Sequence, residues 1–125
     1  MKILCWNVQG AKKFQLQQEV GFINRTIKSD ILILLETMVN MHNAVLIVKR
    51  LGFQNYSTIP PQDHVGGMWL PWNVDNVVVN IIAKEARIIH CTVFDKINSN
   101  QCMLSAIYAP AQEHEKMFLG ITSSI

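Results

Sequence analysis

The chain has 125 residues, of which 50% are hydrophobic and 16% are charged. This apolar content excludes an intrinsically disordered protein and is enough for one folded domain or a piece of one. The formal net charge of +2 is too small to indicate nucleic-acid binding from charge alone.

The longest uninterrupted apolar run covers only residues 31–35, which is too short to cross a membrane. The N-terminal apolar stretch breaks at Asn7 before it resembles an export signal. Cys5, Cys91 and Cys102 are odd in number and show no metal-binding spacing, which favours reduced thiols. We therefore expect an intracellular protein, nuclear or cytoplasmic, with no membrane partner.

The first half of the chain is predicted to alternate strands and helices. Residues 2–7 are predicted to form a strand, and the helical spacing of apolar residues predicts a helix over 12–28. The run at 31–35 has no polar alternation, as expected of a central strand covered on both faces. A second amphipathic helix is predicted over 43–51, closed by Gly52.

After Gly52 the pattern is typical of strands joined by short polar turns. The predicted strands are residues 53–59, 67–72, 76–83, 87–94 and 102–109. We expect the last four to form an antiparallel meander, followed by a helix over 112–119. The predicted fold class is α/β (α+β), with one mixed, mostly antiparallel sheet flanked by two helices.

Three polar side chains stand at predicted strand ends: Asn7, Glu36 and Tyr108. Binding groups gather at the rim beyond strand ends in open α/β sheets, so these three could converge on one site. Mg²⁺ prefers hard oxygen ligands, and Glu36 supplies one. The alternatives are that Asn7 and Gly10 are ordinary turn residues and that Glu36 caps a helix or is solvated.

Four segments taken in order resemble the motifs of the endonuclease/exonuclease/phosphatase superfamily, which is DNase I-like. They are WNVQG at residues 6–10, DILILLET at 30–37, GGMWL at 66–70 and IYAP at 107–110. The sequence is most similar in character to the endonuclease domains of plant LINE-type non-LTR retrotransposons. The resemblance runs from residue 2 to about residue 119 and corresponds to the N-terminal half of a four-layer α/β sandwich.

The resemblance implies a Mg²⁺-dependent endonuclease that hydrolyses phosphodiesters in DNA, with Mn²⁺ as a possible substitute. It makes Glu36 a direct metal ligand and Asn7 a residue that orients the metal and the phosphate. Tyr108 would hydrogen-bond the phosphate or the attacking water. Gly66 and Gly67 would be structural, opening the strand that follows them.

The resemblance also implies two further motifs, Gly-Asp-Phe-Asn-like and Ser-Asp-His-like, which the 125 residues do not contain. The four histidines, His42, His64, His90 and His114, do not stand in motifs that could replace them. We therefore expect residues 1–125 to be a truncated domain, inactive alone, with weak or absent metal binding. The alternative is a non-enzymatic remnant of a retrotransposon that binds nucleic acid or another protein.

The family fold packs two sheets face to face, and the chain is expected to hold about one of them. The inward faces of strands 76–83, 87–94 and 102–109 would then expose apolar side chains. This predicts self-association through an exposed apolar sheet face. Trp69 is expected to pack in the core, whereas Trp72 could either pack or stack on a nucleic-acid base.

Overall fold

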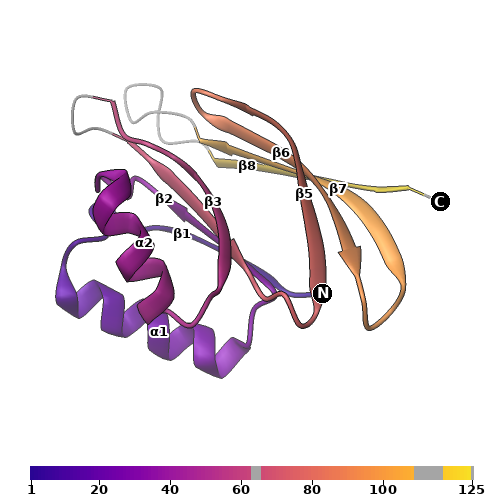
Figure 1. Ribbon diagram of the computed structural model, residues 1–125, viewed down its shortest axis with the longest axis horizontal. Helices are drawn as coiled ribbons and strands as arrows, with labels where there is room; N and C mark the ends of the chain where they lie inside the picture. The colour runs from indigo at the N-terminus through magenta and orange to yellow at the C-terminus, as the bar shows by residue number, and fades with distance from the viewer. Residues whose placement is uncertain (63–65, 109–116, 125) are drawn as a thin grey trace. The chain divides into compact units, whose positions relative to one another are not determined.

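The computed structural model describes residues 1–62, 66–108 and 117–124, and the chain divides into two compact units, Met1–Asn73 and Val74–Ile125. The first unit contains β1 (Ile3–Asn7), α1 (Phe14–Ile27), β2 (Ile31–Leu35), α2 (Met41–Arg50), β3 (Asn55–Ile59) and β4 (Met68–Trp72) (Figure 1). The second contains β5 (Val77–Glu85), β6 (Ile88–Asp95), β7 (Asn100–Tyr108) and β8 (Met117–Ser124). The α+β fold class is confirmed.

The sheet of the first unit has the strand order β1-β2-β4-β3. β1 and β2 are parallel, whereas β4 runs antiparallel to both of its neighbours. Every residue of β2 is buried, as its unbroken apolar run predicts. Parallel pairing places the C-terminal ends of β1 and β2 at the same edge of the sheet.

Both helices of the first unit pack on one face of its sheet (Figure 1). The core between them contains Leu32 and Leu34 from β2, Trp69 from β4, Val20 from α1 and Val48 from α2. The predicted burial of Trp69 is confirmed. Trp72 is also buried, which removes it as a base-stacking platform.

The two helices begin differently. Asn40 caps α2, because its side chain accepts a hydrogen bond of 3.0 Å from the backbone N–H of Asn43. Lys13 occupies the same position before α1 and, in the described part of the chain, makes no side-chain capping bond. α1 ends at Lys28, which adopts a left-handed conformation and donates its N–H to the Asn24 carbonyl.

The sheet of the second unit has the strand order β5-β6-β7-β8, and each described pair is antiparallel. Burial alternates along β6 and β7, as expected for strands with two different faces. One set of alternating residues is buried: Ile89, Cys91, Val93, Leu104 and Ala106.

Those buried residues belong to the face that was predicted to be exposed, so that prediction is wrong. The other face of the same sheet carries the exposed apolar side chains Val78, Phe94 and Met103. Val78 and Phe94 are direct partners across β5 and β6, and Met103 faces Thr92, two residues from Phe94. This second face is mixed, because Thr92 and Gln101 lie beside these apolar side chains.

Three other expectations need correction. The strands occupy two sheets instead of one mixed sheet. The predicted strand 67–72 belongs to the first sheet, because it is apolar throughout and pairs as β4 with β2 and β3. The predicted helix 112–119 lies outside the described residues up to 116, and from Met117 onward the chain is a strand. Pairing with β7 overrides the local helical spacing there.

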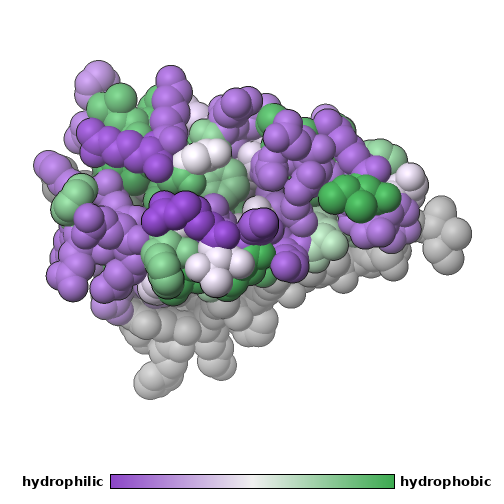
Figure 2. All heavy atoms as spheres, turned by 90° about the horizontal axis from the view of Figure 1, so that it is seen from below, coloured by the Kyte–Doolittle hydropathy of each residue, from purple (hydrophilic) through white to green (hydrophobic). Residues whose placement is uncertain are grey.

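Among the described residues, neither helix is long and apolar enough to cross a membrane. Figure 2 shows hydrophilic side chains over most of the face that carries α1, interrupted by separate hydrophobic ones. α1 contributes exposed Phe14 and Phe22 to the molecular surface.

Candidate functional site

Asn7 and Glu36 lie at one edge of the first sheet. Asn7 ends β1 and pairs with Leu35, the last residue of the parallel strand β2. Glu36 directly follows Leu35. The structure therefore brings together the two residues that were predicted as metal-site candidates in this unit.

The chain beyond these strand ends continues the parallel pairing through backbone hydrogen bonds. The Val8 N–H donates to the Leu35 carbonyl at 2.9 Å and the Gly10 N–H donates to the Glu36 carbonyl at 2.8 Å. The Ala11 N–H donates to the Thr37 carbonyl at 2.8 Å. The segments that carry Asn7 and Glu36 are thus fixed to each other rather than free to separate.

Glu36 has an unusual backbone conformation, with φ of +54°. Residues other than glycine seldom adopt this left-handed region, which costs roughly 1–2 kcal/mol. Leu32 and Leu34 point into the helix-covered core, and regular alternation would send Glu36 to the same face. The left-handed conformation of Glu36 interrupts the alternation of side chains along β2 directly after the strand ends.

Neither alternative interpretation of Glu36 is supported. The next helix begins at Met41 and is capped by Asn40, so Glu36 does not cap it. Glu36 is also buried, with only 9% of the residue exposed, so it is not an ordinary solvated residue. Strained backbone at a buried acidic residue is more typical of functional sites than of plain turns.

The interpretation of Asn7 and Gly10 as turn residues is supported, and it is compatible with a functional role. The Asn7 Oδ1 atom accepts a hydrogen bond of 3.2 Å from the Gln9 N–H. Gly10 has φ of +107°, which favours glycine. An amide oxygen has two lone pairs, so this turn leaves Asn7 able to accept a second contact.

The Gly66-Gly67 segment enters β4 at the same edge and is structural, as predicted. Both residues have positive φ, +83° and +95°. The Met38 N–H donates to the Gly66 carbonyl at 2.8 Å, and the Thr37 N–H donates to the Gly67 carbonyl at 3.3 Å. The proximity of Thr37 to Gly67 was not predicted from the sequence, where two adjacent glycines before a buried strand were the only available signal.

Tyr108 closes β7 in the second unit and is buried, and its N–H donates to the Arg87 carbonyl at 3.0 Å. Among the histidines, His42 lies in α2 and is exposed, whereas the Nδ1 atom of His90 lies 2.7 Å from the Ser105 Oγ. His64 and His114 lie outside the described residues.

The donor set at the edge of the first sheet suits a hard cation. A carboxylate from Glu36 and an amide oxygen from Asn7 are ligand types that Mg²⁺ accepts, and Mg²⁺ commonly keeps several waters and uses one or two carboxylates. Over residues 1–62, 66–108 and 117–124 there is no group of three or more His, Cys, Asp and Glu side chains that could hold a metal. These described residues therefore provide no closed protein cage for a metal ion.

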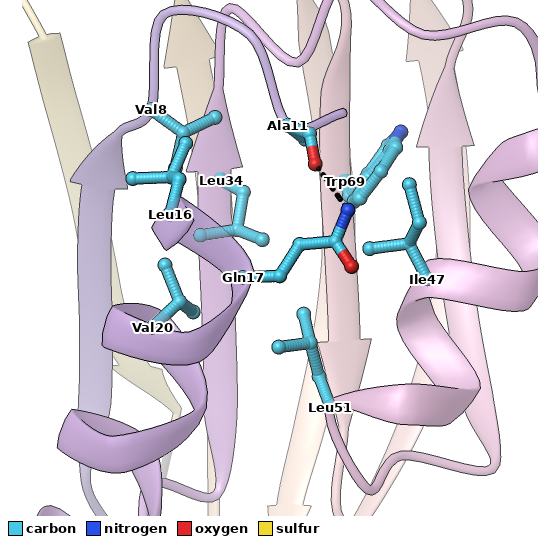
Figure 3. Close-up of a pocket in the computed structure, with 9 residues that line it drawn as sticks. All are labelled: Val8, Ala11, Leu16, Gln17, Val20, Leu34, Ile47, Leu51 and Trp69. Carbon is cyan, nitrogen blue, oxygen red and sulfur yellow. Dashed lines mark hydrogen bonds between the residues drawn. The ribbon is translucent and has the colours of Figure 1, made fainter. Parts of the chain in front are cut away.

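A small apolar cavity lies behind this edge, between the helices and the sheet (Figure 3). Its volume is about 10 Å³, which is close to the minimum for one water, so it is a packing void and not a ligand site. At its rim the Gln17 Nε2 atom donates to the Ala11 carbonyl at 2.9 Å, as drawn in Figure 3. This bond anchors the segment between β1 and α1.

An open groove of about 450 Å³ lies at the start of α1, next to the turn that follows Asn7. Gln9, Lys13 and Phe14 are among its lining residues. Phe14 is 70% exposed and Lys13 is also exposed, so the groove offers an aromatic ring and a cation to solvent.

No protein-family model matches the sequence, and no curated protein matches it significantly. Among solved structures, the human Nocturnin catalytic domain with a bound sulfate anion is similar, with a TM-score of 0.57 and 16% sequence identity. The similarity covers 82% of this chain and 47% of the Nocturnin chain, so this chain spans about half the length of that domain. Nocturnin has the endonuclease/exonuclease/phosphatase (DNase I-like) fold. At this identity the similarity shows the fold alone, and the fold of this chain is consistent with a partial DNase I-like sandwich.

Proposed function

We propose that the chain is part of a Mg²⁺-dependent phosphodiesterase of the endonuclease type that acts on DNA. The observation that carries the proposal is the position of Asn7 beside a strained, buried Glu36: Asn7 pairs with Leu35, and Glu36 directly follows Leu35. The DNase I-like fold supports a phosphodiesterase-like domain in general. The assignment to LINE-type retrotransposons of plants rests on the sequence motifs alone.

Each residue has a proposed role. Glu36 holds the cation through its carboxylate, and Asn7 orients the cation and the phosphate through its amide. Tyr108 donates its phenolic hydrogen to the phosphate or to the attacking water. When bound, Mg²⁺ would act as a Lewis acid on the phosphoryl oxygens; Mn²⁺ could replace it.

We propose further that the 125-residue chain does not cleave DNA by itself. The sequence contains neither Gly-Asp-Phe-Asn nor Ser-Asp-His, the patterns that the resemblance assigns to water activation and transition-state stabilisation. A site with one carboxylate also binds Mg²⁺ weakly. The proposed setting is intracellular, because three cysteines without disulfide or zinc spacing suit a reducing compartment.

A supercoiled-plasmid assay tests this proposal. The purified chain, Glu36→Gln and the control Glu85→Gln, which changes an exposed carboxylate of β5, are incubated with Mg²⁺. We expect no cleavage by any of them, but Mg²⁺-dependent DNA binding that Glu36→Gln weakens by about tenfold and Glu85→Gln leaves intact. Cleavage that disappears only in Glu36→Gln would overturn the proposed inactivity and support the catalytic role of Glu36.

A second candidate is a module that binds nucleic acid without metal or chemistry. The groove at the start of α1 favours it, because Phe14 could stack on a base and Lys13 could contact a phosphate. This candidate predicts DNA binding that neither EDTA nor Glu36→Gln changes but that Phe14→Ala weakens. Binding lost with EDTA would exclude it.

A further inference from the structure

We propose that Gly67 is a positioning residue for Glu36: the absence of a side chain at Gly67 lets its backbone hold Thr37 and so fix the left-handed turn at Glu36. This inference rests on the proposed function of Glu36 as a cation ligand.

A Cβ atom placed on Gly67 would lie 2.5 Å from the Thr37 Oγ1 atom and 3.4 Å from the Met38 backbone nitrogen. Contacts below 3.0 Å essentially do not occur, so any larger residue would displace Thr37. Thr37 cannot move away easily, because it is completely buried. Within the described residues its Oγ1 atom is buried without a hydrogen-bond partner.

The unpartnered hydroxyl indicates that Thr37 is held in place by its backbone and not by its side chain. A buried hydroxyl without a hydrogen-bond partner is unfavourable. The Thr37 side chain therefore makes no hydrogen bond to a described residue that would hold it in this position. The backbone bonds supply the constraint: the Thr37 N–H donates to Gly67, and the Thr37 carbonyl accepts from Ala11. Thr37 is therefore fixed from both sides.

These bonds transmit the position of Gly67 to Glu36. Glu36 precedes Thr37 directly, and its own carbonyl accepts a hydrogen bond of 2.8 Å from Gly10. Met38, held by the Gly66 carbonyl, repeats the left-handed conformation with φ of +54°. A strained conformation persists only where its surroundings determine it, and here the Gly66-Gly67 segment does so.

The test compares Gly67→Ala with Gly52→Ala. Gly52 has nearly the same φ, +96° against +95°, but a Cβ atom there would meet nothing within 4 Å. Gly52→Ala therefore carries the backbone strain of the substitution without the contact. A third variant, Gly67→Ala with Thr37→Ala, keeps the strain and removes the Oγ1 atom.

Two quantities are measured for each variant: Mn²⁺ affinity by electron paramagnetic resonance, and amide hydrogen exchange in the metal-free protein. We expect Gly67→Ala to lower Mn²⁺ affinity by about tenfold, the size typical of losing a residue that orients a ligand. Exchange at Gly10 and Ala11, whose N–H groups bond to the 36–37 backbone, should become faster by a similar factor. Gly52→Ala should change neither, and the double variant should recover most of both.

The exchange measurement separates this inference from the proposed function. Absence of Mn²⁺ binding in the unmodified chain would refute the cation site, while faster exchange at Gly10 and Ala11 in Gly67→Ala alone would still support the positioning role. Unchanged exchange at those two residues in Gly67→Ala would overturn it. So would a double variant that fails to fold or to recover, because the contact with Thr37 would then not be the cause.

Discussion

Glu36 combines a strained backbone with burial at the end of β2. Its left-handed backbone is unfavourable for a residue with a side chain, yet the position is occupied by a carboxylate and not by glycine. Among the described residues, Gln9, Lys28, Met38 and Ser99 also have positive φ without being glycine, so the conformation alone does not mark a functional residue. The proposed role of Glu36 therefore rests on its strain, its burial and its position beside Asn7 taken together.

Replacing Glu36 by glycine should therefore stabilise the fold relative to replacement by alanine. Both variants lose the carboxylate, but only glycine relieves the backbone strain. We therefore expect the free energy of unfolding of Glu36→Gly to be about 1 kcal/mol higher than that of Glu36→Ala. Urea unfolding followed by tryptophan fluorescence measures the difference, since Trp69 is buried in the core of the same unit. Equal stabilities would show that the turn is not strained.

The thiols give a prediction about alkaline pH. Burial raises the pKa of the Cys5 thiol from 9.0 to about 11. The pKa of the Cys91 thiol is raised from 9.0 to about 11 by burial and, to a smaller extent, by the charge of the nearby Cys102. Above pH 9 the unfolded chain loses these protons while the folded chain keeps them, so stability should fall between about pH 9 and pH 11. The urea midpoint of Cys5→Ala/Cys91→Ala should fall less steeply over this range; parallel curves would contradict the prediction.

At the scale of helices and strands, substitutions at the N-terminal caps of α1 and α2 are expected to change stability in opposite directions. Asn40→Ala removes the bond to the Asn43 N–H and should lower the free energy of unfolding by about 1 kcal/mol. Lys13 makes no side-chain capping bond to a described residue at the start of α1. Lys13→Ser adds a side chain that can make one and should raise the free energy of unfolding by up to about 1 kcal/mol. Thermal unfolding of the two variants beside the unmodified chain checks both signs. A Lys13→Ser variant less stable than the unmodified chain would show that Lys13 has a structural role.

The elements of the first unit were largely predictable because their signals are local. β2 was predicted at 31–35, its observed bounds, since an unbroken apolar run between polar residues defines a central strand. The helix at 112–119 was wrong from Met117 onward, because pairing with β7 is a long-range contact that helical spacing does not reveal. Asn7 and Glu36 could be predicted as neighbours from parallel strand ends. The left-handed turn and the contact between Thr37 and Gly67 could not, because each depends on a third segment.

At the scale of the whole molecule, the sequence did not show that the strands form two sheets. The turn between β4 and β5 resembles the other short connections, so nothing local marks the change of sheet. The sequence predicted an exposed apolar face on the second sheet but not the correct one. Val78, Phe94 and Met103 are exposed on the face opposite to the predicted one.

We expect the chain to self-associate through this surface. Val78, Phe94 and Met103 are 41%, 39% and 44% exposed on one face of the second sheet. Light scattering should show dimers or larger species, and Phe94→Ser with Met103→Ser should shift them toward monomer. Ile97→Ser is the control, because Ile97 is exposed in the turn after β6 and not on this face. A monomer at every concentration would contradict the prediction.

The central claim is that Asn7 and Glu36 form a cation site at the end of β1 and β2, and paramagnetic broadening by Mn²⁺ in a nuclear magnetic resonance spectrum tests it most directly. Added in small amounts to the isotope-labelled chain, Mn²⁺ should first broaden the side-chain amide of Asn7 and the backbone amides of Gly10 and Thr37. Glu36→Gln should abolish this selectivity. If the signals around exposed carboxylates such as Glu19 broaden first, or if Glu36→Gln leaves the pattern unchanged, the claim is contradicted.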